Sequence, residues 1–149
     1  MLREHYRGGQ TFFVTPRIAD LPEIEDFLKT HVPEVSYAVA HGQLAAGDLD
    51  ERMNGFYDGR FDVLLATSIV ESGLDIPTAN TMIVHRADMF GLSQLYQIRG
   101  RVGRAKTRAY CYLTTKPPRA AYAAGYQASA PSGRARQSRR RLQPRRARS

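Results

Sequence analysis

Short apolar runs alternate with amphipathic stretches along the first 113 residues, and this alternation constrains the fold more than any other feature. Thr11-Phe12-Phe13-Val14 is a short apolar run, which is typical of a strand buried on both faces. Asp20, followed by Pro22 and Glu23, predicts a helix start. The apolar residues that follow fall on one helical face: Leu21, Ile24, Phe27 and Leu28. A strand is therefore followed directly by a helix.

The same order repeats further along the chain. We expect strands at 37–40, 63–66, 82–84 and 109–113, and helices at 48–57 and 92–98. Alternating strands and helices with short connections predict an α/β domain whose mainly parallel sheet is flanked by helices. Ligands of such sheets gather at the carboxyl ends of the strands. That rule indicates the segments 15–17, 41–43 and 67–75.

The positive charge is concentrated at the C-terminal end. The formal net charge is +8, and eight of the 22 Lys and Arg residues follow Gly133, where no acid occurs. The other 14 balance the 14 acids, so DNA binding by the folded part depends on particular residues rather than on net charge. Aliphatic residues are almost absent after 116, and such composition cannot offset chain entropy. We expect a truncated leading helix at 1–7, one domain at 8–116 and a disordered Arg-rich tail at 117–149.

Several other classes of protein and site are disfavoured. No apolar run approaches the roughly 20 residues of a membrane span, and the charged opening lacks the apolar block of a signal peptide. We expect a cytoplasmic protein without membrane partners. Cys111 is the only cysteine, and its apolar neighbours predict a buried core residue in a strand. The four histidines lack ligand spacing, so no metal site is predicted.

Two motifs carry chemistry. In Leu65-Ala66-Thr67-Ser68-Ile69-Val70-Glu71-Ser72-Gly73-Leu74-Asp75-Ile76-Pro77, a strand ends in a polar loop where backbone N–H groups can meet a phosphate or sugar. In Gln97-Ile98-Arg99-Gly100-Arg101-Val102-Gly103-Arg104, glycines separate arginines whose planar guanidinium groups can approach one anion. Taken separately, the two motifs are also compatible with an ordinary strand-to-helix turn and a solvated basic turn.

Together these motifs resemble the fifth and sixth signature motifs of superfamily-two helicases, which lie in the second of two RecA-like domains. Within that superfamily, residues 71–81, 86–92 and 97–104 closely resemble the transcription-repair coupling factor family. The similarity spans about residues 7–115. It implies a single RecA-like helicase C-terminal domain that belongs to an ATP-driven translocase on double-stranded DNA.

The resemblance also implies roles for single residues. Arg101 and Arg104 are the catalytic arginines that reach the γ-phosphate of ATP, where stabilising charge speeds phosphoryl transfer. Cofactor binding falls to Gly73, Asp75, Gln97 and Gly100. Sequence-independent DNA-backbone contact falls to Arg17, His41, Gly42, Gln43, Thr67 and Glu71. Local capping is the alternative for several of them, and Pro16 stands where relatives often have Asn before the arginine.

The ATP-binding half of such a motor is missing from these residues. No G-x-x-x-x-G-K-[ST] string occurs. We therefore expect ATP with Mg²⁺ to be bound mainly by a first RecA-like domain outside this chain, and we expect the chain alone to be inactive. The resemblance implies RNA polymerase and excision-repair proteins as partners of the intact protein.

The tail has a second interpretation. In the family, the chain continues with a segment of the type L-G-A-G-F-x-L-A. If the codons for residues 121–149 are read in a frame shifted by one base, permitted synonymous codons encode a segment that resembles this continuation. The hypothesis is a one-base slip near Pro117, which the nucleotide sequence tests. Three alternatives stay open: a RecG-type fork-reversing helicase fragment, a non-catalytic nucleic-acid binder that uses its basic tail, and a product without function of its own.

Overall fold

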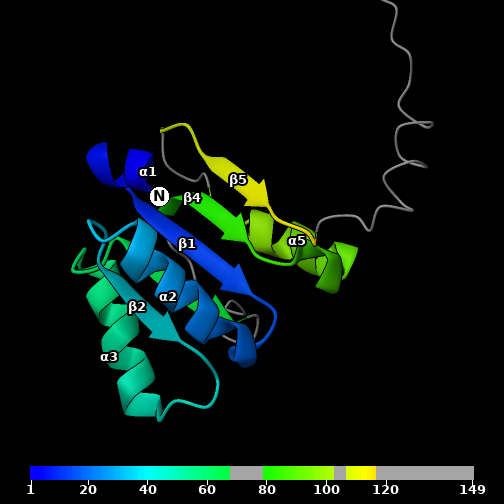
Figure 1. Cartoon of the computed structure of the whole chain (residues 1–149), viewed down its shortest axis with the longest axis horizontal. Helices are drawn as coiled ribbons and strands as arrows, with labels where there is room; N and C mark the ends of the chain where they lie inside the picture. Colours follow the sequence, from blue (N-terminus) through cyan, green and yellow to red (C-terminus); the bar gives the residue numbers. More distant parts are fainter. Residues whose placement is uncertain (68–78, 103–106, 117–149) are drawn as a thin grey trace, which may run out of the picture. The chain divides into compact units, whose positions relative to one another are not determined.

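The computed structural model describes residues 1–67, 79–102 and 107–116 (Figure 1). Residues Met1–Lys116 form one compact unit. The predicted tail at 117–149 lies outside the described residues. The α/β architecture predicted from the alternation of strands and helices is confirmed by the five-stranded sheet and the helices beside it.

The sheet consists of parallel strands only. Its strands are β1 (Gln10–Thr15), β2 (Tyr37–Ala40), β3 (Val63–Thr67), β4 (Ala79–Val84) and β5 (Tyr110–Leu113), in the order β2-β3-β1-β4-β5. Each neighbouring pair is parallel, so all five carboxyl ends lie at one edge of the sheet. This edge, called the carboxyl edge below, runs from β2 to β5.

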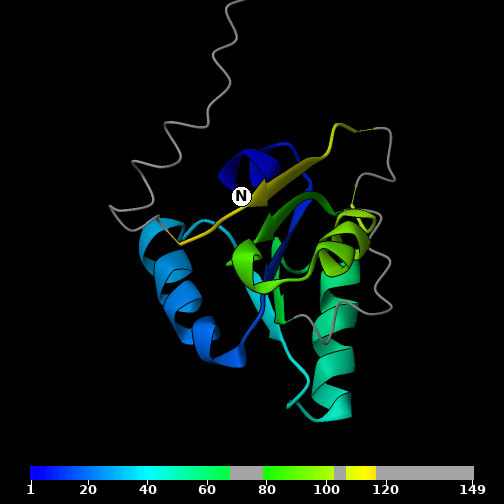
Figure 2. The ribbon, with the colours of Figure 1, turned by 90° about the vertical axis from the view of Figure 1, so that its right-hand side faces the viewer.

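Helices cover both faces of the sheet, which gives three layers (Figure 2). The short helix α1 (Leu2–Tyr6) and α2 (Leu21–His31) pack on one face, where Phe13 and Leu65 point. On the other face, α3 (Ala46–Tyr57) and α5 (Leu92–Arg99) pack over Phe12 and Leu64. Two further single turns are 3-10 helices, η1 (Ile18–Asp20) and η2 (Ala87–Met89). The central strand β1 is buried along its whole length, because it faces a helix layer on either side.

The start of α2 departs in detail from the prediction. Asp20 occupies the N-cap position, but its carboxylate makes no capping bond because it binds Arg17 and Thr15 instead. Phe27 lies at the rim of the helical face and is 47% exposed, and its ring stacks on His31 at 4.7 Å. Leu21, Ile24 and Leu28 are buried as the spacing predicts.

Strand β4 begins earlier than predicted, at Ala79, because the polar residues Asn80 and Thr81 are buried in it. Asn80 is 8% exposed and Thr81 is 4% exposed. The hydroxyl of Thr81 donates to Glu4 at 2.5 Å, and Glu4, a residue of α1, is itself buried. Because Thr81 is buried against Glu4, 77 residues away in the sequence, the start of β4 shows no alternation of apolar and polar residues that would predict a strand.

The prediction that Cys111 is a buried core residue is wrong. Cys111 lies in β5 as expected, but β5 is the last strand of the sheet and Cys111 is exposed. Only the first residue of the strand is half-buried, because α1 and α5 leave the outer strand largely uncovered. Within the described residues, no helix is long and apolar enough to cross a bilayer.

Candidate functional site

The carboxyl edge collects the polar segments that follow three neighbouring strands. Thr15 at the end of β1 is aligned with Thr67 at the end of β3, and Ala40 at the end of β2 is aligned with Ala66. The segments that begin at Arg17 and His41 therefore leave the sheet beside Thr67. The sequence rule for ligand sites in parallel sheets predicts this grouping.

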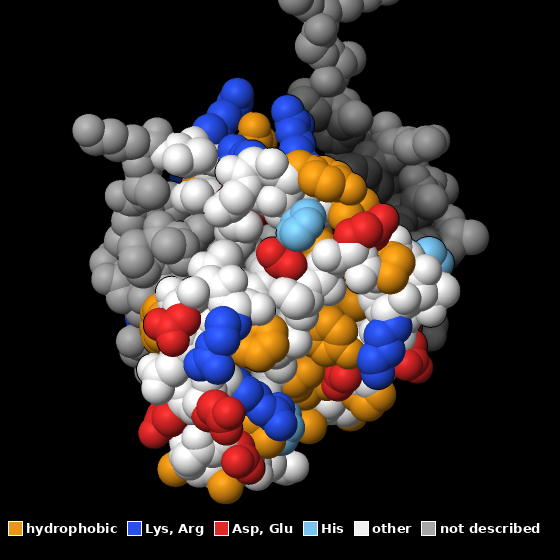
Figure 3. Space-filling model, turned by 90° about the vertical axis from the view of Figure 1, so that its left-hand side faces the viewer, with side chains coloured by type: hydrophobic (Ala, Val, Ile, Leu, Met, Phe, Trp, Pro, Cys, Tyr) orange, Lys and Arg blue, Asp and Glu red, His pale blue; other side chains and the backbone are white. Residues whose placement is uncertain are grey.

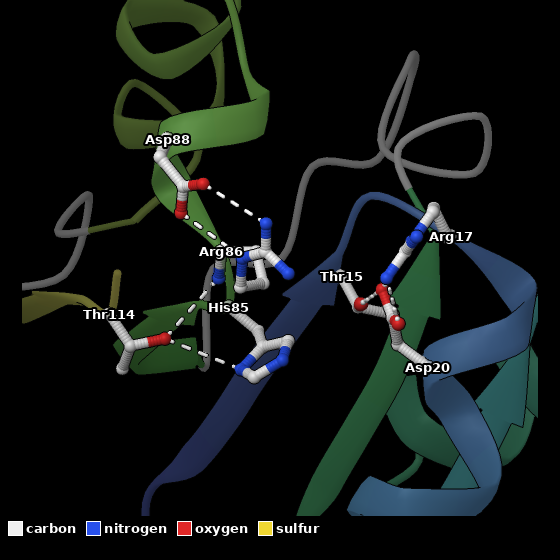
Figure 4. A network of polar contacts seen from close by, with 7 residues as sticks. All are labelled: Thr15, Arg17, Asp20, His85, Arg86, Asp88 and Thr114. Atoms are coloured by element: carbon white, nitrogen blue, oxygen red, sulfur yellow. Dashed lines mark hydrogen bonds and ion pairs between the residues drawn. The ribbon is translucent and has the colours of Figure 1, made fainter. Parts of the chain in front are cut away.

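Arg17 is oriented by Asp20. Its Nη2 atom lies 2.7 Å from Oδ1 of Asp20 and its Nε atom lies 3.1 Å from Oδ2 (Figure 4). The hydroxyl of Thr15 also donates to Asp20, at 3.4 Å. The hydrogen bonds from Arg17 hold the pKa of Asp20 below its usual range. Because the Arg17 side chain is 51% exposed, its guanidinium is fixed on one side and open to an anion on the other.

A second polar group follows β4 on the same edge (Figure 4). Arg86 binds Asp88 through two hydrogen bonds of 3.2 and 3.1 Å, which hold the pKa of Asp88 below its usual range. The hydroxyl of Thr114 accepts a bond from the Arg86 backbone N–H and contacts Nδ1 of His85, both at 3.3 Å. Arg86 has a φ of 53°, a left-handed conformation that is unusual for a residue with a side chain.

No role was predicted for these residues from the sequence. The only local signal was the Arg-x-Asp spacing of Arg86 and Asp88, because Thr114 reaches Arg86 from the segment that follows β5. The left-handed backbone of Arg86 could not be predicted from the sequence, because such positions are usually occupied by glycine, asparagine or aspartate and not by arginine.

The segment after β2 forms a tight turn. The backbone N–H of Gln43 donates to Nδ1 of His41 at 3.3 Å, and the N–H of Leu44 donates to the His41 carbonyl at 3.2 Å. Nδ1 is thus an acceptor, which leaves the proton of the neutral ring on Nε2. Gly42 and Gln43 are exposed, so their backbone is accessible to a ligand.

Thr67 is buried at the end of β3, with an exposed fraction of 2%. Its hydroxyl finds no hydrogen-bond partner within the described part of the chain. A buried hydroxyl without a hydrogen bond lowers the stability of the fold. The Thr67 hydroxyl is therefore suited to a hydrogen bond with a group that is not among the described residues. The predicted site residues Glu71, Gly73 and Asp75 lie outside those residues.

The arginine-containing turn follows α5 in another part of the domain. Ile98 anchors α5 in the core, whereas Gln97 is exposed. Arg101 is half-buried, and its N–H donates to the Ile98 carbonyl at 3.1 Å. Gly100 has a φ of −64°, so its backbone conformation does not require glycine. Arg104 lies outside the described residues.

The position of this turn follows from the connection between two parallel strands. Because β4 and β5 run in the same direction, α5 has to return from the carboxyl edge toward the opposite one (Figure 1). The structure therefore brings Arg17, His41 and Thr67 together and places the residues from Gln97 to Arg101 at the far end of α5.

Two other kinds of site deserve comparison with this geometry. A groove of about 420 Å³ lies between α2 and β4, and apart from a few polar residues such as His85 and Thr114 it is lined mainly by apolar side chains, among them Phe13, Ile24, Phe27 and Ile83. Within residues 1–67, 79–102 and 107–116, no group of three or more His, Cys, Asp or Glu side chains is arranged to hold a metal ion.

Comparison with known proteins identifies the kind of domain. Residues 1–106 match the family described as helicase conserved C-terminal domain. A transcription-repair-coupling factor of Rickettsia bellii is 60% identical over 114 residues, which cover 76% of this chain and 10% of the relative. That of Escherichia coli is 47% identical over 120 residues, 80% of this chain and 10% of the relative. The chain thus spans about a tenth of the length of these curated relatives.

Solved structures give the same fold. The structure of RecG bound to a three-way DNA junction matches with a TM-score of 0.66 and 37% identity, over 84% of this chain and 17% of that one. The C-terminal part of the Fun30 ATPase domain matches with a TM-score of 0.61 and 19% identity, over 75% of this chain and 37% of that one. The second likeness shows the fold alone.

Proposed function

The chain belongs to the helicase conserved C-terminal domain family, and on that premise we propose that it is the second motor domain of an ATP-dependent DNA translocase of transcription-coupled repair. The observation that carries the proposal is the 60% identity to a transcription-repair-coupling factor over 114 residues. The 37% identity to RecG is lower, which favours the coupling factor over a RecG-type fork-reversing helicase.

The nucleotide side of the proposed function rests on α5 and the turn after it. Arg101 and Arg104 supply positive charge to the γ-phosphate, while Gln97 and Asp75 orient those arginines and the nucleotide sugar. Gly73 and Gly100 allow the backbone to approach the nucleotide. The donor groups present at the exposed Gln97 and the half-buried Arg101 fit phosphate and sugar oxygens. Bound ATP would supply the phosphoryl group whose transfer drives movement, and a guanidinium stabilises the charge on that group.

The DNA side of the proposed function rests on the carboxyl edge. Arg17, oriented by Asp20, meets a phosphate with its open side. The turn of His41, Gly42 and Gln43 offers exposed backbone to the same strand of DNA. Thr67 supplies its buried hydroxyl, and Glu71 belongs to the loop that follows it. Such contacts hold the backbone of double-stranded DNA without reading its sequence, as a translocase requires.

The proposed motor needs components from outside these 149 residues. A first RecA-like domain holds Mg²⁺ and most of the ATP, because the phosphate-binding string is absent here. RNA polymerase and excision-repair proteins are the proposed partners of the intact protein, in the cytoplasm. The chain alone is then expected to bind DNA but not to hydrolyse ATP.

A graft tests this proposal. Residues 1–116 replace the matching segment of the Rickettsia bellii coupling factor, and DNA-stimulated ATP hydrolysis is measured for the graft and for its R101A and R104A variants. We expect the graft to be active and each variant to lose about a thousand-fold in kcat, because a trans-acting arginine has that effect. R60A removes an exposed arginine that pairs with Asp58 and serves as the control. Full activity of R101A and R104A would contradict the assignment.

A further inference from the structure

Two tyrosines on β5, the half-buried Tyr110 and the exposed Tyr112, form an aromatic surface on the outer strand of the sheet. Tyr110 and Tyr112 stand on the same face of the strand, with nearly parallel rings at 14° and centroids 6.3 Å apart. They are aligned with Thr81 and Ile83 of β4, which places them on the face that carries α1. Tyr112 is 52% exposed, so one ring face is accessible to a partner.

Three arginines converge on the first of these rings. The guanidinium carbons of Arg3, Arg7 and Arg108 lie 6.0, 5.4 and 5.7 Å from the centre of the Tyr110 ring. These distances are within the range of cation–π attraction. Arg3 and Arg7 belong to α1 and its C-cap, and Arg108 precedes β5, so two elements far apart in the sequence build the cluster. Lys and Arg side chains project at the end of the molecule where α1 lies, without the acidic neighbours seen lower on that face (Figure 3).

The charges of this cluster are not balanced. Glu4 is buried and binds Arg7 through two hydrogen bonds of 2.9 and 2.7 Å, and Nη2 of Arg7 also donates to the Arg108 carbonyl. Glu4 therefore neutralises one guanidinium. Neither Arg3 nor Arg108 forms an ion pair with a carboxylate in the described part of the chain. Two like charges held close to one ring repel each other, and an anion between them would relieve that repulsion.

We propose that Arg3, Arg108, Tyr110 and Tyr112, called the β5 platform below, bind single-stranded nucleic acid. The guanidinium groups take backbone phosphates, and the exposed ring of Tyr112 stacks on an unpaired base. A duplex fits less well, because its bases are stacked on one another and offer no open face to a side chain. Arg3 and Arg108 lie at Tyr110, at the start of β5, whereas Arg17 and Thr67 lie at the carboxyl edge, and the platform shares no residue with the proposed motor sites.

Binding is measured on the full chain by fluorescence anisotropy, with a labelled oligothymidine and with a duplex of the same length. Y112A is expected to bind the single strand about ten-fold more weakly, because stacking on one base is worth roughly 1–3 kcal/mol. Y112F keeps the ring and should bind like the unchanged chain. Y96A removes an exposed tyrosine of α5 and serves as the control.

The basic tail also attracts nucleic acid, so the arginines need a charge-matched comparison. R3Q/R108Q is expected to reduce the preference for single strand over duplex, whereas R139Q/R140Q removes the same charge and should leave that preference unchanged. An oligothymidine substituted with 5-iododeoxyuridine should form photo-crosslinks to Tyr110 or Tyr112. The proposal is overturned if crosslinks occur only in other segments, if Y112A binds like Y96A, or if an acidic peptide displaces the single strand at equal charge concentration.

Discussion

Arg17 and Asp20 form a fixed pair at the carboxyl edge, with Nη2 and Nε of the arginine 2.7 and 3.1 Å from the two carboxylate oxygens. The pair has two consequences. It holds one side of the guanidinium in a set direction while half of the Arg17 side chain stays exposed. It also replaces the capping bond expected of Asp20 at the start of α2.

The first prediction concerns DNA binding by Arg17. R17Q is expected to lower the slope of log affinity against log salt concentration for duplex DNA by about 0.9, because one phosphate contact is lost. Fluorescence anisotropy over a series of salt concentrations measures this slope. R60Q removes the same charge from a side chain that pairs with Asp58, and it should leave the slope nearly unchanged. Equal slopes for R17Q and R60Q would remove Arg17 from the DNA contact.

The second prediction concerns the pH dependence of the same pair. The folded-state pKa of Asp20 lies below the unfolded value of about 3.9, so its stabilisation is present above that value and is lost as the pH falls through the folded pKa. D20N should be less stable than the unchanged chain near pH 6 by less than about 1 kcal/mol, because Arg17 is half-exposed. The difference in the free energy of unfolding should shrink as the pH falls below about 4. Urea titrations measure it, and a constant difference would argue against the ion pair.

The third prediction concerns the buried carboxylate of Glu4 in α1. E4Q removes the charge that binds Arg7 and accepts from Thr81, and we expect it to lower the free energy of unfolding by about 2 kcal/mol. E34Q makes the same chemical change at an exposed position and should stay within about 0.5 kcal/mol. Urea denaturation of both variants gives the comparison. Similar stabilities would mean that α1 is not held by Glu4.

The fourth prediction concerns two glycines, of which only Gly59 has a backbone conformation that favours glycine. Gly100 has a φ of −64°, and an added Cβ would lie 3.5 Å from two carbonyl oxygens, an ordinary contact distance. G100A should therefore be neutral or stabilise the fold by up to about 1 kcal/mol. Gly59 has a φ of +76° with open space around its Cβ position, so G59A should cost roughly 1–2 kcal/mol through backbone strain alone. If G100A instead destabilises as much as G59A, then Gly100 is required by the fold.

The sequence predicted most of the sheet because its strands are short, mainly apolar and bounded by a turn or helix signal. Its rule for parallel sheets also placed Arg17, His41 and Thr67 at one edge, although their contact with DNA stays a prediction. The polar start of β4 was missed because burial of Thr81 depends on Glu4, which no local pattern reveals. The burial of Cys111 was predicted wrongly because the sequence does not show that β5 is an edge strand of the sheet.

The site was harder to predict than the fold. The bond between Arg17 and Asp20 has the spacing of three residues that a reader of the sequence can recognise. Thr114 reaches the backbone of Arg86 from 28 residues away, and Arg108 reaches Tyr110 together with residues of α1. Such groupings depend on strand order, which is settled only when the whole chain has folded.

Helix α5 connects the segment after β4 with the turn that contains Arg101. Eight helical residues measure about 12 Å along the axis, and Ile98 fixes this rod to the sheet near its far end. A displacement applied at Arg101 is passed along a hydrogen-bonded rod to Leu92, next to the edge where Arg86 and Thr114 meet. We therefore expect the two ends of α5 to move together as one rigid helix.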